Sequence, residues 1–255
     1  YDIDSNYISE DSYPFTKKEV INYIKDYVKS YRWGWYYQQL LKLYIFKTGV
    51  IKKDYVLIFD SDLLFLKNIS FFEYGKPKLF KRNTEASGGK IHKPYLDSIN
   101  YLIPELDIKS EESGICHFML FNKKNIEDLL SLVENKFNKP AWMAFMDSVI
   151  DYISKNGYDE SLFSEYELYY SFTKDKNIYV YDYDFKYIDC PIDKIPIIND
   201  FNLVADHHYQ SRAPESWKKD NLLEEHIEDL KKIDLIIKKY TNKKIIYQEH
   251  HKYHN

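Results

Sequence analysis

Hydrophobic positions in the first part of the chain follow helical spacing in two places. Thr16 and Glu19 form a capping-box pattern, which predicts a helix start, and apolar residues continue at helical spacing to a predicted end near Arg32. Residues 33–35 contain a glycine between two tryptophans and are predicted to break the helix. A second helix is then expected over about 35–47.

A hydrophobic run follows these helices; it begins at Asp54 and is apolar from Tyr55 to Phe59. It lacks the period-two alternation of a half-buried strand, so the pattern predicts a strand that is buried on both faces, as in a parallel α/β sheet. Asp60-Ser61-Asp62 stands where this strand should end, and a second apolar stretch begins at Leu63. The fold class predicted from this order is α/β.

The rest of the chain predicts further strands and helices in alternation. Strands are expected over 113–121, 177–183 and 201–209. Helices are expected after a cap at Asn125, from Pro140 to Gly157, from about residue 161, and in an amphipathic stretch over 222–237. Ser164 and Glu167 also form a capping-box pattern. We see no internal repeat or linker, and we expect one domain over 1–255, with a C-terminal helix and tail over 218–255.

Composition narrows the class of protein. The 255 residues carry a net charge of −4, which argues against a general nucleic-acid-binding surface. No apolar run is long enough to cross a bilayer. Cys116 and Cys190 have no metal-type spacing and suit a reducing compartment. No signal peptide is visible after Tyr1, so a cytoplasmic location is favoured, although the chain start at Tyr1 leaves targeting open.

The two acids of Asp60-Ser61-Asp62 are the first candidate chemistry. Carboxylates between two apolar runs are costly to bury unless a cation balances them, and hard oxygen ligands suit Mg²⁺ or Mn²⁺. His207 and His208 end a predicted strand, and either could complete such a metal site. The alternative is a solvated acidic turn and a polar strand end.

Two further stretches are candidate ligand-binding elements. Four residues share one face of the second helix by their three- and four-residue spacing: Trp35, Gln38, Gln39 and Lys42. This face could bind a ligand through amide hydrogen bonds and one positive charge. The alternative is a solvated face. Ser113 and Gly114 are a small-residue entry to a predicted strand, and the glycine permits close approach of a ligand to the backbone. His117 is a candidate that could equally be a core histidine. Glu165 and Glu167 cannot occupy one helical face, so at most one is expected to point into a site.

The sequence resembles the nucleotide-sugar glycosyltransferases of the GT-A fold. The stretches that carry the resemblance are the helix Gly34-Trp35-Tyr36-Tyr37-Gln38-Gln39-Leu40-Leu41-Lys42-Leu43, the acid-pair strand over 55–62 and the segment over 163–169. They resemble most closely a bacterial and viral group with a Gly-Trp-x-x-Gln-Gln helix before an Asp-x-Asp motif. The resemblance extends from Tyr7 to Trp217.

The resemblance implies a mixed, Rossmann-like sheet flanked by helices and a metal-dependent sugar transfer. It implies that Asp62, with Asp60 close by, binds the diphosphate of a nucleotide-diphosphate sugar through Mn²⁺ or Mg²⁺, and that Ser61 lies near the ribose. Gln39 stands where related enzymes carry a donor-binding Arg, and His207 or His208 matches a late metal-binding histidine. Glu165 would be the catalytic acid–base residue. The acceptor would be a glycan, lipid or protein, in glycan or surface polysaccharide synthesis.

Three alternatives stay open. GT-A domains usually place βα units before the acid pair, so either these first units lie upstream of Tyr1 or the nucleotide pocket is built differently. A phosphatase of the haloacid dehalogenase type also uses Asp-x-Asp after a buried strand, with Asp60 as nucleophile, but it expects Thr or Val where Leu64 stands. A non-catalytic sugar-binding relic of the transferase fold is the third reading, because surplus aromatic residues suit sugar stacking.

Overall fold

A computed structural model of the chain describes most of residues 8–182 and two short strands beyond them. The described residues are 8–60, 63–65, 68–83, 92–106, 108, 111–158, 161–176, 178–182, 187–189 and 203–205. The chain divides into two compact units. The larger unit comprises Tyr1–Asp60 and Ser70–Asp184, and the smaller unit comprises Ser61–Ile69 and Phe185–Asn255.

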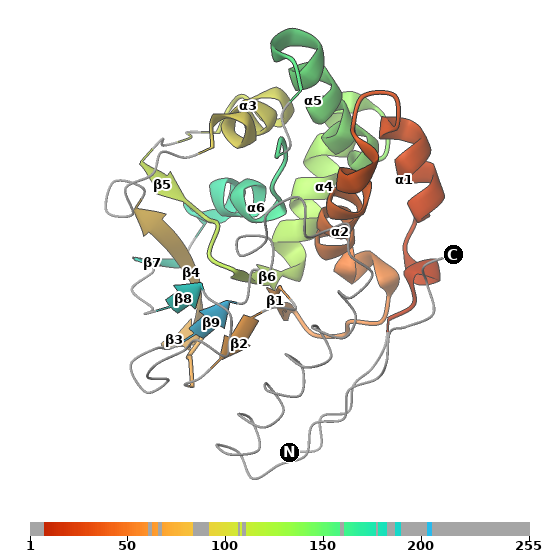
Figure 1. Cartoon of the computed structure of the whole chain (residues 1–255). Coiled ribbons are helices and arrows are strands. Elements are labelled where there is room, and N and C mark those ends of the chain that lie inside the picture. Colours follow the sequence, from red (N-terminus) through yellow and green to blue (C-terminus); the bar gives the residue numbers. More distant parts are fainter. Residues whose placement is uncertain are drawn as a thin grey trace, which may run out of the picture. The chain divides into compact units, whose positions relative to one another are not determined.

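The larger unit contains six α-helices among its described residues (Figure 1). They are α1 (Lys17–Ile24), α2 (Trp33–Leu43), α3 (Lys93–Leu102), α4 (Lys123–Phe137), α5 (Ala141–Asn156) and α6 (Glu165–Thr173), with short 3-10 turns at η1 (Glu10–Ser12), η2 (Ser30–Arg32) and η3 (Ile45–Thr48). One hydrophobic core joins them, and its side chains include Leu40, Leu43, Leu129, Phe145 and Leu168. The helices are therefore held by tertiary packing of their apolar faces.

The strands of the larger unit pair in two small sheets. β1 (Tyr55–Phe59) pairs antiparallel with β6 (Phe118–Asn122). β4 (Lys76–Asn83) pairs antiparallel with β3 (Phe72–Glu73) and β5 (Glu112–Ser113), and parallel with β7 (Tyr179–Asp182). Helices α4 and α6 pack against β6. The α/β class is thus confirmed, with mixed strand pairing.

The described part of the smaller unit is three short strands and residues 68–69. β2 (Leu63–Phe65) pairs antiparallel with β9 (Leu203–Ala205), and β8 (Tyr187–Asp189) pairs parallel with β9. The predicted strand over 201–209 is confirmed at its centre. The C-terminal helix and tail predicted over 218–255 lie outside the described residues.

The apolar run over 54–59 does form a strand, but the prediction of a doubly buried, parallel strand is wrong. β1 is antiparallel to β6, its residues are only partly buried, and the side chain of Phe59 is 48% exposed. Val56 and Ile58 pack on the helical core. The run lacks polar alternation because its outer face keeps apolar residues, and exposed apolar atoms are common on protein surfaces.

Some helix boundaries were predicted correctly from capping residues, and others were not. The capping box of Thr16 and Glu19 is present at the start of α1, and α5 runs between Pro140 and Gly157 as predicted. The predicted end of the first helix near Arg32 is wrong. α1 ends at Ile24, although the apolar spacing continues in the sequence. Val28 is buried in the turn that follows the helix, and its backbone carbonyl accepts a hydrogen bond from the Trp33 indole.

Three other boundaries are corrected. The predicted break at 33–35 is instead the first turn of α2. α4 is capped by Asn122, whose Oδ1 accepts from the Asn125 backbone, so the cap lies three residues earlier than predicted. The single strand expected over 113–121 is split into β5 and β6, because His117 has a left-handed backbone with φ of 59°.

Candidate functional site

The ammonium of Lys42 joins three segments of the chain, and the last contact lies 123 positions from Lys42. Its Nζ donates to Oδ1 of Asp60 at 2.6 Å and to Oε1 of Glu165 at 2.7 Å. It also lies over the ring of Tyr166, 4.5 Å from the ring centroid. Lys42 comes from α2, Asp60 follows β1, and Glu165 and Tyr166 open α6. All of these residues belong to the larger unit.

A regular spacing on α2 positions this contact. Tyr36, Gln39 and Lys42 are three residues apart and therefore lie along one side of the helix. The Tyr36 hydroxyl accepts from the backbone of Leu162, and Gln39 Oε1 accepts from the Glu165 backbone at 2.9 Å. Lys42 then reaches the Glu165 side chain. One side of α2 thus holds the chain just before and at the start of α6.

The start of α6 is fixed by its own cap. Ser164 accepts from the Glu167 backbone, as the predicted capping pattern requires, and the helix begins at Glu165 rather than near residue 161. Both glutamates of this first turn are buried, with 2% and 1% exposure. Glu165 binds Lys42, whereas Glu167 binds the Ser113 hydroxyl and the Gly114 backbone, so each buried carboxylate has its own partners. The expectation that at most one of the two points into a site stays a prediction.

The two carboxylates of this cluster share one ammonium. Burial raises the pKa of Glu165, and the ion pair with Lys42 opposes that rise. Burial alone would lower the pKa of Lys42, but the carboxylates of Glu165 and Asp60 outweigh it, so its pKa is raised and the lysine stays charged. A proton on Glu165 would make the three groups together neutral.

A second route holds the backbone of Asp60. The Asp60 amide donates to the carbonyl of His117 at 3.3 Å. His117 ends a short segment that begins at Ser113 and Gly114, and both of these donate to Oε2 of Glu167, at 2.6 and 3.2 Å. Two buried acids on one helical turn are therefore connected to Asp60. Glu165 is connected to the Asp60 side chain through Lys42, and Glu167 is connected to the Asp60 backbone through the segment 113–117.

The structure brings together most of the predicted residues that it describes. Gln39, Lys42, Asp60 and Glu165 are in direct contact, and Ser113, Gly114 and His117 follow through Glu167 and the backbone. Trp35 instead stacks with Arg32, at 4.1 Å, and Gln38 is exposed. Ser61, Asp62, His207 and His208 lie outside the described residues.

Sequence reasoning missed two members of this site. Tyr166 provides the aromatic face under Lys42, and Glu167 had no assigned role. The three-residue spacing of Tyr36, Gln39 and Lys42 was a usable signal for a contact side of α2. Nothing in the local sequence indicates that its partners lie more than 120 positions away.

The fit of a metal ion can be tested at Asp60. Oδ1 is taken by Lys42, but the side chain is 31% exposed, which leaves its other carboxylate oxygen able to bind a hard cation. Within the described ranges no group of three or more His, Cys, Asp or Glu side chains is placed to hold a metal. The described chain thus supplies one fitting ligand, and the other predicted ligands lie beyond it.

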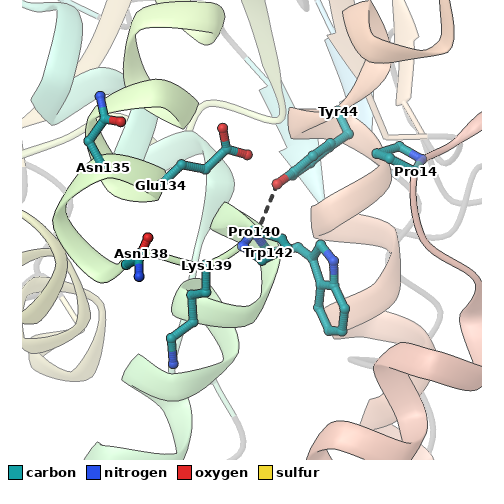
Figure 2. A pocket seen from close by; sticks show the side chains of 8 residues that line it. All are labelled: Pro14, Tyr44, Glu134, Asn135, Asn138, Lys139, Pro140 and Trp142. Carbon is teal, nitrogen blue, oxygen red and sulfur yellow. Dashed lines mark hydrogen bonds between the residues drawn. The ribbon is translucent and has the colours of Figure 1, made fainter.

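A separate cavity of about 520 Å³ lies beside the start of α5 (Figure 2). Its lining residues are Pro14, Tyr44, Glu134, Asn135, Asn138, Lys139, Pro140 and Trp142. The backbone donors of Ala141 and Trp142 are already used by Glu134 and by the Tyr44 hydroxyl. Lys139 is paired with Asp147. Since no residue of the Lys42 cluster lines it, we assign no function to this cavity.

Comparison with known proteins places the chain in a family. Residues 16–230 match the Family of unknown function (DUF6492), so the chain belongs to that family. The match covers all three segments that meet at Lys42. No curated protein and no solved structure matches the chain. In the part of the chain that the structure describes, we find no helix with the length and apolar character needed to span a membrane.

Proposed function

We propose that the chain is a metal-dependent glycosyltransferase that moves a sugar from a nucleotide-diphosphate sugar to a glycan, lipid or protein acceptor. The observation that carries the proposal is the convergence at Lys42 of Asp60, Glu165 and the α2 helix. These are the three stretches through which the sequence resembles GT-A glycosyltransferases. A resemblance spread over three distant stretches has more weight when those stretches form one site.

The proposal includes a variant of the GT-A fold. Its support is the mixed strand pairing of the larger unit and the position of Asp60 directly after β1. In this reading α2 precedes the acid-bearing strand and α6 closes the site from the other side. The antiparallel partner of β1 is part of the proposed variant.

Asp60 is the described residue that would hold the metal; the other ligands that the sequence predicts, Asp62 and His207 or His208, lie outside the described residues. When bound, a divalent cation offsets the negative charge that grows on the departing diphosphate. Lys42 orients the Asp60 carboxylate by a charge-assisted hydrogen bond. Gln39 holds the α6 backbone, so in this proposal it is a positioning residue.

The predicted role of Glu165 as an acid–base residue stays a prediction. A base must reach the proton that it accepts, and the Glu165 carboxylate is 2% exposed and bound to Lys42. The role therefore requires that the carboxylate be released from Lys42 in the loaded enzyme. An inverting enzyme needs such a base, whereas in a retaining enzyme Glu165 could stabilise the positive charge on the sugar.

The test is release of nucleoside diphosphate from a panel of UDP-, GDP- and dTDP-sugars, with Mn²⁺, with Mg²⁺ or with EDTA. We expect release from one donor class, dependent on the metal and abolished in Asp60→Asn and Asp62→Asn. Asp128→Asn is the matched control, because Asp128 forms an exposed pair with Lys124 on α4. Donor binding without release would support the non-catalytic alternative. A phosphorylated Asp60 would support the phosphatase.

A further inference from the structure

Glu167 is a buried carboxylate with a defined set of donors. Its side chain is 1% exposed, and one oxygen, Oε2, accepts from both Ser113 Oγ and the Gly114 backbone. Burying a carboxylate is costly unless donors compensate it, and these two bonds provide that compensation. The predicted function leaves this residue without a role.

The segment held by Glu167 is tightly packed against α6. A Cβ atom added to Gly114 would lie 2.1 Å from Cβ of Tyr170 and 3.1 Å from the Tyr166 carbonyl oxygen. Ser113 Oγ also accepts from the Ile115 backbone at 3.3 Å. The beginning of the segment therefore cannot shift against α6 without breaking several contacts.

The far end of the same segment is the His117 carbonyl. The left-handed backbone of His117 turns the chain into β6, and its carbonyl accepts from the Asp60 amide. Cys116, between the two ends, is buried, and its thiol donates to the Phe80 carbonyl at 3.4 Å. Five residues thus connect the carboxylate of Glu167 to the backbone of Asp60.

We propose that Glu167 is a positioning residue for Asp60. It fixes the start of the 113–117 segment, and the end of that segment holds the Asp60 backbone at the end of β1. Glu165, two residues earlier on α6, fixes the Asp60 side chain through Lys42. The functional part of this inference rests on the proposed role of Asp60 in donor binding.

The protonation of Glu167 offers a readout that a purely structural role would not give. Burial raises its pKa to about 7, while the bonds from Ser113 and Gly114 and the charge of Lys174 oppose the rise. Tyr170 on α6 and Cys116 in the segment are the other titratable groups that feel its charge. Above pH 7 the carboxylate is ionised and its bonds to the segment are strongest.

The first arm of the test is amide hydrogen exchange in the full chain, which needs no ligand. Ser113→Ala and Glu167→Leu should raise the exchange rate of the Asp60 amide at least tenfold relative to that of Leu130 in α4. Glu167→Gln keeps an acceptor and should change it by less than threefold, as should the exposed control Glu105→Gln. If Glu167→Leu does not fold, Ser113→Ala decides. An unchanged Asp60 amide, or an equal rise at Leu130, overturns the inference.

The second arm is the pH dependence of nucleoside-diphosphate release between pH 6 and 8. In the wild type the rate should rise roughly fivefold through pH 7, the ratio expected between a charge-assisted and a neutral hydrogen bond. In Glu167→Gln this step should be absent, and a retained step overturns the functional part. If no sugar nucleotide is turned over, the proposed function fails, and the exchange arm alone decides the role of Glu167.

Discussion

The ammonium of Lys42 and the buried carboxylate of Glu165 are 2.7 Å apart and connect helices whose residues are separated by 123 positions. The contact explains how two helices that are remote in sequence can build one site. It also binds the candidate catalytic acid and the candidate metal ligand Asp60 to the same cation.

Loss of the shared ammonium should be strongly destabilising. Lys42→Met leaves Glu165 buried without its cation, and breaking a buried pair costs about 3 kcal/mol. Urea unfolding at pH 7 measures this, with Lys124→Met as the control, because its exposed pair contributes less than about 0.5 kcal/mol. Adding Glu165→Gln to Lys42→Met should recover part of the loss. A Lys42→Met protein as stable as the control would contradict the buried pair.

Stability should fall as the pH rises from about 4.5 to about 7. The pKa of Glu167 is raised from its ordinary 4.5 to about 7, so across this window the native state keeps a proton that the unfolded state has lost. The stabilisation is complete below the unfolded value and is lost as pH rises through the folded one, by at most about 3 kcal/mol. Glu167→Gln should flatten this part of the curve, and Glu105→Gln should not. Equal slopes in both variants would exclude Glu167 as the source.

Two glycines should respond in opposite directions to alanine. Gly114→Ala places a Cβ against Tyr170, so we expect a loss of about 3 kcal/mol in the free energy of unfolding. Gly34 lies in the first turn of α2 with nothing near its missing Cβ, and Gly34→Ala should gain about 0.5 to 1 kcal/mol. Thermal and urea unfolding check both. A neutral Gly114→Ala would mean that the segment is not packed against α6.

The Tyr44 hydroxyl should contribute to the stability of the fold. It accepts from the Trp142 backbone at 2.9 Å, where α5 begins (Figure 2). Tyr44→Phe keeps the ring but leaves a buried donor without its acceptor, which costs about 1 to 2 kcal/mol. Tyr74→Phe, at a side chain that is 90% exposed, is the control and should cost almost nothing. Equal stability of the two variants would remove this role of the hydroxyl.

Local signals predicted much of the helical part of the fold. The Thr16–Glu19 box, Pro140, Gly157 and Ser164 act within one turn of the residues that they cap, so their effect can be read from neighbours in sequence. The end of α1 was mispredicted because Val28 keeps its helical spacing in sequence yet is buried in a turn. Spacing alone does not distinguish the two.

The residues of the candidate site were predicted, but the contacts between them were not. Asp60, Glu165, Lys42 and Gln39 were identified as candidates, and they do meet. The contacts of Lys42 and Gln39 with Glu165 depend on tertiary packing across more than 120 positions. The same reason explains why the antiparallel partner of β1 and the burial of both Glu165 and Glu167 could not be predicted.

The most direct test is calorimetric titration of UDP, GDP and dTDP into the full chain, with Mn²⁺ or with EDTA. We predict that one of the three nucleotides binds only with Mn²⁺, that Asp60→Asn weakens this binding at least tenfold, and that Asp128→Asn leaves it unchanged. Nucleotide binding that depends on neither Mn²⁺ nor Asp60, or no binding of any of the three nucleotides, would contradict a donor site at the end of β1.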